Sequence, residues 1–470
     1  MDMNNKTNIL LITADDMNWD AVGAYGCPVN GTTPNIDKLA EEGIRFDHAH
    51  VTISVCQPSR SALMTGLYPH RSCGEGFYNL RKPEVPILPE LLKNGGYTVG
   101  ILGKVGHSTP YNSFQWDMHF DIDELGHGRN PSIYFEHATN FIEQAQQDNK
   151  PFFLMLNSHD PHRPFYGNDN PLWYDDECPA SIPSKTFIPN EIKVPGFLED
   201  LPDVRLEISE YYSSVRRCDD TIGATLNILK QLDCYENTLV IFLSDNGMAF
   251  PFSKTNCYLN STKTPWIMRW PSYIKAGIKD QKHFISGIDM LPTILDVAGV
   301  PQQKNVDGTS FLPILRGEEQ TNRELVFTQF HQTAAKSNYP MRCVQNKQFG
   351  YIFNPWADGK RNFKNESQAG RTMKAMQNAS LEDNNIAERV DLFLHRTKEE
   401  FYDFENDPNA RNNLFGNPEY ADEITKLQKE LETWMIKTGD KALTAFQNRD
   451  SKEALELFMK QQADELNGTI

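Results

Sequence analysis

The stretch Cys56-Gln57-Pro58-Ser59-Arg60, with Leu63 and Thr65-Gly66 behind it, decides how this chain is interpreted. A loop should enter a helix here, because Pro58 suits the first helical turn, where its missing N–H would be unpaired anyway. The residues Ser61-Ala-Leu-Met64 then continue with fair helix formers. Cys56 is therefore expected at a helix N-terminus, where unpaired N–H groups favour an anion.

Four apolar runs around this stretch predict buried strands, and each ends in polar residues. The runs cover residues 8–13, 98–102, 151–157 and 238–244. Helical patterns lie between them, at 35–42, 88–93, 134–147 and 206–232. Strands that alternate with helices predict an α/β sheet covered on both faces. In such sheets ligands bind at the carboxyl ends of the strands, so the polar clusters there predict one convergent site.

The pattern changes in the last third of the chain. After a helix at 289–297, short strands of a smaller sheet are expected at 325–330, 341–345 and 348–353, with closing helices at 420–436 and 451–466. Residues 164–205 predict a long excursion over the surface, and residues 355–390 are polar and ambiguous. We therefore expect a larger domain over 1–322 and a smaller sheet-and-helix domain over 323–470.

Composition excludes some classes of protein. The net charge of −17, from 63 acidic and 46 basic residues, repels polyanions and disfavours a nucleic-acid binder. No apolar stretch of about 18 residues occurs, so no membrane span is expected. The eight cysteines contain no C-x-x-C pair and predict neither a zinc site nor a dense disulfide framework. The polar residues 1–7 form no charged-then-apolar leader, so we expect a cytoplasmic protein or a trimmed periplasmic or secreted one.

Two polar pairs follow two of the predicted strands. Asp15-Asp16 comes after the first strand and Asp245-Asn246 after the strand at 238–244. Hard oxygen ligands of this kind suit Ca²⁺ or Mg²⁺, and adjacent carboxylates need a cation to sit together. The alternative is that these residues cap helices or form turns.

The pattern Cys-x-Pro-Ser-Arg-x-x-Leu-x-Thr-Gly resembles the signature of the type I sulfatases. This resemblance implies an alkaline-phosphatase-like sandwich, with a large mixed central sheet flanked by helices and a smaller C-terminal α+β domain that completes the substrate pocket. It also implies that a sulfatase-maturating enzyme oxidises Cys56 to formylglycine, whose hydrate is the nucleophile. A divalent cation, Ca²⁺ or else Mg²⁺, would then be held by the four residues of the two polar pairs and by residue 56.

The same resemblance assigns roles to five more residues. Arg60 and Lys104 would neutralise charge on the nucleophile and the sulfate, and Lys254 would grip the sulfate. His162 in His-Asp-Pro-His-Arg would be the general acid, and His107 would take a proton from the second hydroxyl. For each of these residues the alternative is an ordinary structural role or a surface salt bridge. The neighbouring Lys263 is a second basic candidate in the loop of Lys254.

Several segments are similar to the sulfamidase branch of that family, which acts on N-sulfated glucosamine of heparan sulfate. They include His159-Asp-Pro-His-Arg163, Lys254-Thr-Asn256 and Tyr339-Pro-Met-Arg342. By this resemblance His331 and Arg342 bind substrate from the second domain, or else form hydrogen bonds at the domain interface. Lys254 stands where that branch has Arg, and the Lys104–His107 spacing is one residue longer than in many members.

The sequence thus predicts a sulfohydrolase that removes sulfate from a sulfated glycan, with N-sulfated glucosamine as the first candidate substrate. Three alternatives stay open. They are an O-sulfatase acting on another sulfated sugar, a phosphonate or phosphodiester hydrolase of the same superfamily, and a non-catalytic protein that binds sulfated glycans.

Overall fold

A computed structural model describes residues 6–80, 85–167 and 180–466. Its strands are β1 (Asn8–Ala14), β2 (Ile44–Phe46), β3 (Ala49–His50), β4 (Thr98–Leu102), β5 (Met118–Phe120), β6 (Phe152–Asn157), β7 (Thr238–Ser244), β8 (Trp266–Arg269), β9 (Ile278–Asp280), β10 (Ile285–Ser286), β11 (Val326–Gln332), β12 (Asn338–Gln345), β13 (Phe349–Phe353) and β14 (Glu399–Asp403). Its α-helices are α1 (Pro34–Glu41), α2 (Cys56–Thr65), α3 (Pro69–Ser72), α4 (Leu88–Asn94), α5 (Val105–Ser108), α6 (Pro131–Gln147), α7 (Pro202–Gln231), α8 (Leu259–Thr262), α9 (Met290–Ala298), α10 (Leu312–Leu315), α11 (Arg371–Ala379), α12 (Asn384–His395), α13 (Ala421–Thr438), α14 (Leu443–Gln447) and α15 (Lys452–Leu466).

The central sheet is large and mixed, as the sequence predicted. Its eight strands run in the order β5-β4-β6-β1-β7-β8-β2-β9. The first five are parallel to one another, and β8 is antiparallel to both β7 and β2. The carboxyl ends of β4, β6, β1 and β7 therefore lie along one edge of the sheet.

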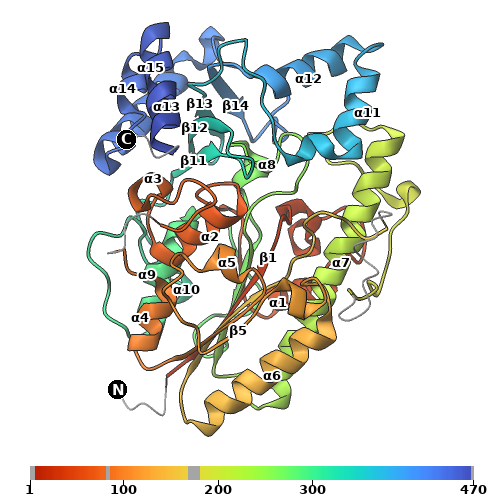
Figure 1. Cartoon of the computed structure of the whole chain (residues 1–470), viewed down its shortest axis with the longest axis vertical. Helices are drawn as coiled ribbons and strands as arrows, with labels where there is room; N and C mark the ends of the chain where they lie inside the picture. The colour runs from red at the N-terminus through yellow and green to blue at the C-terminus, as the bar shows by residue number, and fades with distance from the viewer. Residues whose placement is uncertain (1–5, 81–84, 168–179, 467–470) are drawn as a thin grey trace.

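Helices cover both faces of this sheet, because its strands are apolar on both sides. In β1, Leu10 and Ile12 face one core, and Ile9 and Leu11 face the other. Figure 1 shows α6 and α7 against the first face, and α2, α4 and α9 against the second. All four of these β1 side chains have no exposed surface, as expected for the centre of a doubly covered parallel sheet.

The smaller sheet is antiparallel, in the order β11-β12-β13-β14. It lies with α13, α14 and α15 at the top of Figure 1. A single bridge between Ile53 and Gln329 ties its first strand to the segment that leads into α2. The sheet begins at Val326, close to the predicted boundary after residue 322, and the division into two domains stays a prediction.

The expected elements are found where the pattern was clear. The predicted strands at 98–102 and 238–244 coincide with β4 and β7. The long helix starts at Pro202 rather than at residue 206, because proline fits the first helical turn. The short strands β2 and β8 and the last strand, β14, were not expected from the sequence. The ambiguous stretch 355–390 holds α11 and the start of α12.

Some predictions fall partly outside the described residues. Of the expected excursion at 164–205, residues 168–179 are not described, and the remainder carries one short 3-10 turn, Pro189–Glu191, and the first turn of α7. Cys178 also lies there. The seven described cysteines are all free, and five of them are buried, as expected of small apolar side chains. Within the described ranges, no helix is both long and apolar enough to cross a bilayer.

Candidate active site

Cys56 is the first residue of α2, as the sequence predicted. Val55 precedes it in extended backbone, and Pro58 lies in the first turn. At the other end Gly66 takes a left-handed φ of 66° and donates its N–H to the carbonyl of Ala62, which ends the helix. Every residue of α2 is buried. The helix is thus a rigid element that holds the Cys56 side chain in place.

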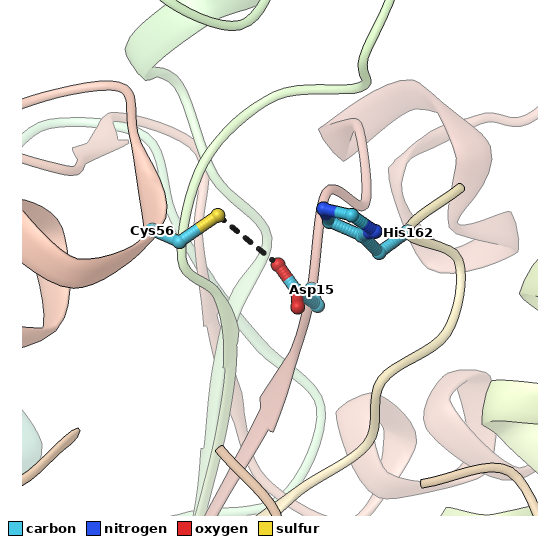
Figure 2. A group of neighbouring side chains, drawn as sticks. All are labelled: Asp15, Cys56 and His162. Carbon is cyan, nitrogen blue, oxygen red and sulfur yellow. Dashed lines mark hydrogen bonds between the residues drawn. The ribbon is translucent and has the colours of Figure 1, made fainter. Parts of the chain in front are cut away.

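The two polar pairs, Asp15-Asp16 and Asp245-Asn246, lie together next to Cys56. Because β1 and β7 are parallel and pair Ala14 with Ser244, the residues that follow them lie side by side. The N–H of Asp16 donates to Asp245 Oδ1 at 3.1 Å, and Asn246 Nδ2 donates to Asp16 Oδ1 at 2.7 Å. The Cys56 thiol donates to Asp15 Oδ1 at 3.5 Å, the contact drawn in Figure 2.

The three carboxylates form a site that suits a cation. Oxygens of Asp15, Asp16 and Asp245 lie within 4.8 Å of one another, and all three side chains are fully buried. Burial raises the pKa of Asp16 and of Asp245 to about 7, against the opposing effects of Lys254 and Arg60. Asn246 Oδ1 is buried and has no hydrogen-bond partner among the described residues. Such a cluster of hard oxygen donors fits a divalent cation.

Three basic side chains surround these carboxylates, one for each. Lys104 pairs with Asp15, Lys254 Nζ lies 2.8 Å from Asp16 Oδ2, and Arg60 Nη2 lies 2.8 Å from Asp245 Oδ2. Burial raises the pKa of Asp15, but Lys104, His162, His159 and Arg60 together outweigh burial and hold the pKa well below its usual value. These three basic side chains therefore come from α2 and from the loops after β4 and β7. The two loops lie at the carboxyl ends of their strands, where the site was expected.

Backbone conformation at the site is strained at two of these positions. Asp16 has a φ of 67° and Lys104 a φ of 52°, both in the left-handed region that residues with a Cβ avoid. Strain of this kind persists where the surrounding structure enforces it, and it clusters at functional sites.

Two histidines of the loop after β6 stack with their ring centres 4.8 Å apart. His159 Nδ1 lies 3.3 Å from Asp15 Oδ2, and His162 Nε2 lies 3.9 Å from Asp16 Oδ2. His162 Nδ1 donates to the carbonyl of Arg163 at 2.6 Å, so the neutral ring presents an unprotonated Nε2 to the site (Figure 2). Burial and then Lys254 lower the pKa of His162 to about 4.

His107 follows β4 within α5 and faces the same space. Its ring packs edge-on against Phe77, with the ring centres 5.6 Å apart. Burial and then the charge of Lys104 lower the pKa of His107 to about 4. At neutral pH His107 is therefore an uncharged imidazole, which can accept a proton.

A pocket of about 460 Å³ opens above Cys56. Both sheets contribute to its walls, since the larger one supplies the reactive groups and the segments after β11 and β13 supply the far side. The lining residues are Val55, Cys56, Phe77, His107, His162, Lys254, Thr255, Thr333, Ala334, Ala335, Lys364, Asn365 and Glu366. Val55, Phe77 and the last six of these were not found from the sequence, because their stretches carry no recognisable spacing.

His331 and Arg342 lie elsewhere in the smaller domain. Arg342 donates two N–H groups to Asp440, one of them at 2.9 Å, and both side chains are almost fully buried. His331 Nε2 lies 2.6 Å from Gln329 Oε1. Neither residue is among the described residues that line the pocket. Both hydrogen-bond partners, Gln329 and Asp440, also lie within residues 323–470, so the substrate contact and the interface role both stay predictions.

Two protein-family models match the chain. The family model described as Sulfatase matches residues 7–300, and the one described as N-sulphoglucosamine sulphohydrolase, C-terminal, matches residues 248–361. The chain belongs to the sulfatase family and is a hydrolase of sulfate bonds. Sulfatases generally use a formylglycine and a divalent cation, and the buried carboxylates next to Cys56 suit that requirement.

Two curated relatives align with nearly the whole chain. Human N-sulphoglucosamine sulphohydrolase is 31% identical over 92% of this chain and 90% of its own length. An ulvan-active sulfatase from Formosa agariphila is 30% identical over 93% of this chain and 82% of its own length.

Solved structures with lower identity share the fold. One is a protein in complex with its substrate D-glucosamine-2-N,6-O-disulfate, with a TM-score of 0.68, 20% identity, and coverage of 93% of this chain and 98% of that one. Another is the phosphonate monoester hydrolase of Agrobacterium radiobacter, with a TM-score of 0.69, 17% identity, and coverage of 92% and 96%. These likenesses bear out the expected alkaline-phosphatase-like sandwich.

Proposed function

We propose that this sulfatase removes the N-sulfate of glucosamine units in a glycan of the heparan type. The observation that carries this proposal is similarity over nearly the full chain to human N-sulphoglucosamine sulphohydrolase, including the C-terminal family segment at 248–361. That segment contains Lys254, Thr255 and residues 333–335 of the pocket wall.

Residue 56 acts as formylglycine in this proposal. Burial, with the negative charges of Asp15 and Asp245 adding to it against Lys254, raises the pKa of the Cys56 thiol well above its usual value. A thiol held protonated in this way is a poor nucleophile, whereas a hydrated aldehyde supplies a hydroxyl. Cys56 is only 3% exposed, so the maturating enzyme must reach it before the chain folds.

The cation site comprises Asp15, Asp16, Asp245, Asn246 and the modified residue 56. A divalent cation bound there would polarise a sulfate oxygen and favour ionisation of the attacking hydroxyl. Ca²⁺ is the first candidate, because it accepts many oxygen ligands in irregular geometry, and Mg²⁺ is the alternative.

The chain's own residues carry the proton transfers. His162 gives the proton at Nε2 to the departing nitrogen as the N–S bond breaks and the sulfur binds the nucleophile's oxygen. The negative charge of bound substrate raises the pKa of His162, which makes the protonated ring available. His107 then takes a proton from the second hydroxyl, so that sulfate leaves and the aldehyde is restored. Lys104 and Lys254 stabilise the negative charge of the sulfate oxygens.

An O-sulfatase is the second candidate function. The ulvan-active sulfatase aligns at nearly the same identity and over the same share of this chain. A phosphonate or phosphodiester hydrolase is supported only by shared fold. A non-catalytic glycan binder has little use for Lys104, His107 and His162 together, so the presence of all three argues against this function.

A substrate panel tests the proposal. Formylglycine-containing protein with Ca²⁺ is given glucosamine sulfated at N, at O-3 or at O-6, ulvan oligosaccharides and an aryl phosphodiester, and free sulfate or phosphate is measured. Release from the N-sulfated sugar alone supports the sulfamidase function. Release only from O-sulfated sugars would assign an O-sulfatase, and release only from the phosphodiester would overturn the sulfatase reaction itself.

A further inference from the structure

A carboxylate, Glu366, lies inside a pocket built for an anion. Its Oε1 is 2.6 Å from Lys254 Nζ and is buried there, while 35% of the side chain stays exposed. Glu366 is one of the residues that line the pocket that substrate enters. None of the roles assigned above uses the Glu366 carboxylate. A negative charge beside a bound sulfate weakens binding unless the carboxylate recognises another group of the substrate.

Glu366 is held by a network rather than by a loose loop. It starts a short 3-10 helix, Glu366–Ala369, and Asn365 before it donates Nδ2–H to Thr255 Oγ1 at 2.7 Å. The backbone N–H of Asn365 donates to the Gln368 side chain. A few residues on, the N–H groups at the start of α11 donate to Glu207 of α7. The segment is therefore anchored at both ends, by Thr255 in the loop after β7 and by Glu207 of α7.

This anchoring places Glu366 next to the general acid. One oxygen of Glu366, one nitrogen of His162 and one oxygen of Asp16 lie within 4.8 Å of one another. The imidazole nitrogen must lie within hydrogen-bond reach of the atom that leaves sulfur. A carboxylate at this distance from His162 can reach the same atom.

The leaving atom differs between the two classes of substrate. The bridging nitrogen of a sulfamate carries a hydrogen and can donate it, whereas the bridging oxygen of a sulfate ester carries only lone pairs. A carboxylate accepts a hydrogen bond from the first and repels the second. A site built to accept a substrate N–H rejects an analogue that lacks it.

We propose that Glu366 selects sulfamates over sulfate esters by accepting a hydrogen bond from the N–H of the scissile N–S bond. This inference rests on the proposed function. It assigns to Glu366 the preference of that site for an N–S bond over an O–S bond. Lys254 keeps Glu366 ionised and turned toward the pocket, and Glu366 in turn limits the charge that Lys254 presents to the sulfate.

The test compares two substrates in each of three variants. Values of kcat/KM are measured for glucosamine N-sulfate and for an aryl sulfate ester, with wild type, Glu366→Met and Glu366→Gln. The N-to-O ratio is expected to fall about 10- to 100-fold in Glu366→Met, and less in Glu366→Gln, whose carbonyl still accepts. Lys364→Met is the matched control, because it removes a charge from the same pocket wall and should change both substrates in proportion.

A binding measurement gives a second readout that does not need turnover. In the Cys56→Ala background, calorimetry with glucosamine N-sulfate and glucosamine 6-O-sulfate should show the N-sulfate preference shrinking when Glu366→Met is added. If both substrates weaken by the same factor in both experiments, Glu366 acts only through Lys254 and the inference is wrong. If the wild type releases no sulfate from the N-sulfated sugar, it is the proposed function that fails.

Discussion

Arg60 donates its Nε–H to one oxygen of Asp245 and holds Nη2 close to the same oxygen as an ion pair. Its Nε lies 2.9 Å and its Nη2 2.8 Å from Asp245 Oδ2, and neither side chain has any exposed surface. The remaining nitrogen, Nη1, donates to Thr13 Oγ1 and Asn157 Oδ1 at 2.8 and 2.7 Å. Arg60 thus ties the helix that begins with Cys56 to the ends of three strands. Its predicted contact with the hydrated aldehyde stays a prediction.

Replacing Arg60 should therefore destabilise the whole protein. Arg60→Met leaves Asp245 buried without its partner, and we expect a loss of about 3–5 kcal/mol in the free energy of unfolding. Denaturant unfolding measures this loss. Arg205→Met is the matched control, since its pair with Asp200 lies at the surface and should matter little. Equal effects in the two variants would mean that the buried pair does not support the site.

Cation binding should strengthen as the pH rises. The pKa values of Asp16 and Asp245 are raised from 3.8 to about 7 in the cation-free protein, so protons occupy these groups at mildly acidic pH. The stability that protonation of these two carboxyls contributes to the folded state is fully present below pH 3.8 and is lost as the pH rises through about 7. A bound cation takes the place of these protons, so it has fewer protons to displace at higher pH. The rise in melting temperature on adding Ca²⁺ after chelation should be larger at pH 8 than at pH 6. A rise that is smaller at pH 8 would contradict this assignment of the cation ligands.

The two lysines of one loop should differ in function. Lys254 lines the pocket and contacts Asp16, whereas the Lys263 ammonium lies 3.8 Å above the ring of Trp19 in a separate cavity. Lys254→Met should lower kcat/KM for sulfate release by about 10²–10³-fold, the loss typical of one charge-stabilising group. Lys263→Met, the control, should leave kcat/KM close to wild type. A larger loss of kcat/KM in Lys263→Met than in Lys254→Met would mean that Lys263, not Lys254, contacts the sulfate.

Arg342 offers a test of a sequence-based interpretation. Burial raises the pKa of Asp440, but Arg342, together with His70 and the backbone N–H of Ala442, outweighs burial and holds the pKa well below its usual value. Asp440→Leu should lower the free energy of unfolding by about 3–5 kcal/mol, because it leaves the buried guanidinium of Arg342 without a partner. The double variant Arg342→Met/Asp440→Leu should recover most of that loss and keep KM near wild type. A folded double variant with a strongly raised KM would make Arg342 a substrate contact.

The sequence could predict what depends on local spacing. Runs such as 8–13 and 238–244 mark strands, and parallel strands bring their ends together, so the meeting of Asp15, Asp16, Asp245 and Cys56 followed from topology. Glu366 and Thr333 could not be found in this way, because they reach the pocket through the packing of a second domain. The short strand β14 was missed for a similar reason, since Glu399–Asp403 carries three acidic residues and is a strand only by pairing with β13.

In the proposed reaction residue 56, next to the carboxylate cluster, performs sulfate release. Sulfate release from glucosamine N-sulfate by wild type and by Cys56→Ala, side by side, tests it most directly, with peptide mass spectrometry to confirm formylglycine in the wild type. We expect turnover only in the wild type, with the same thermal unfolding and the same secondary structure in both proteins. Turnover at a wild-type rate in a folded Cys56→Ala protein would contradict the account.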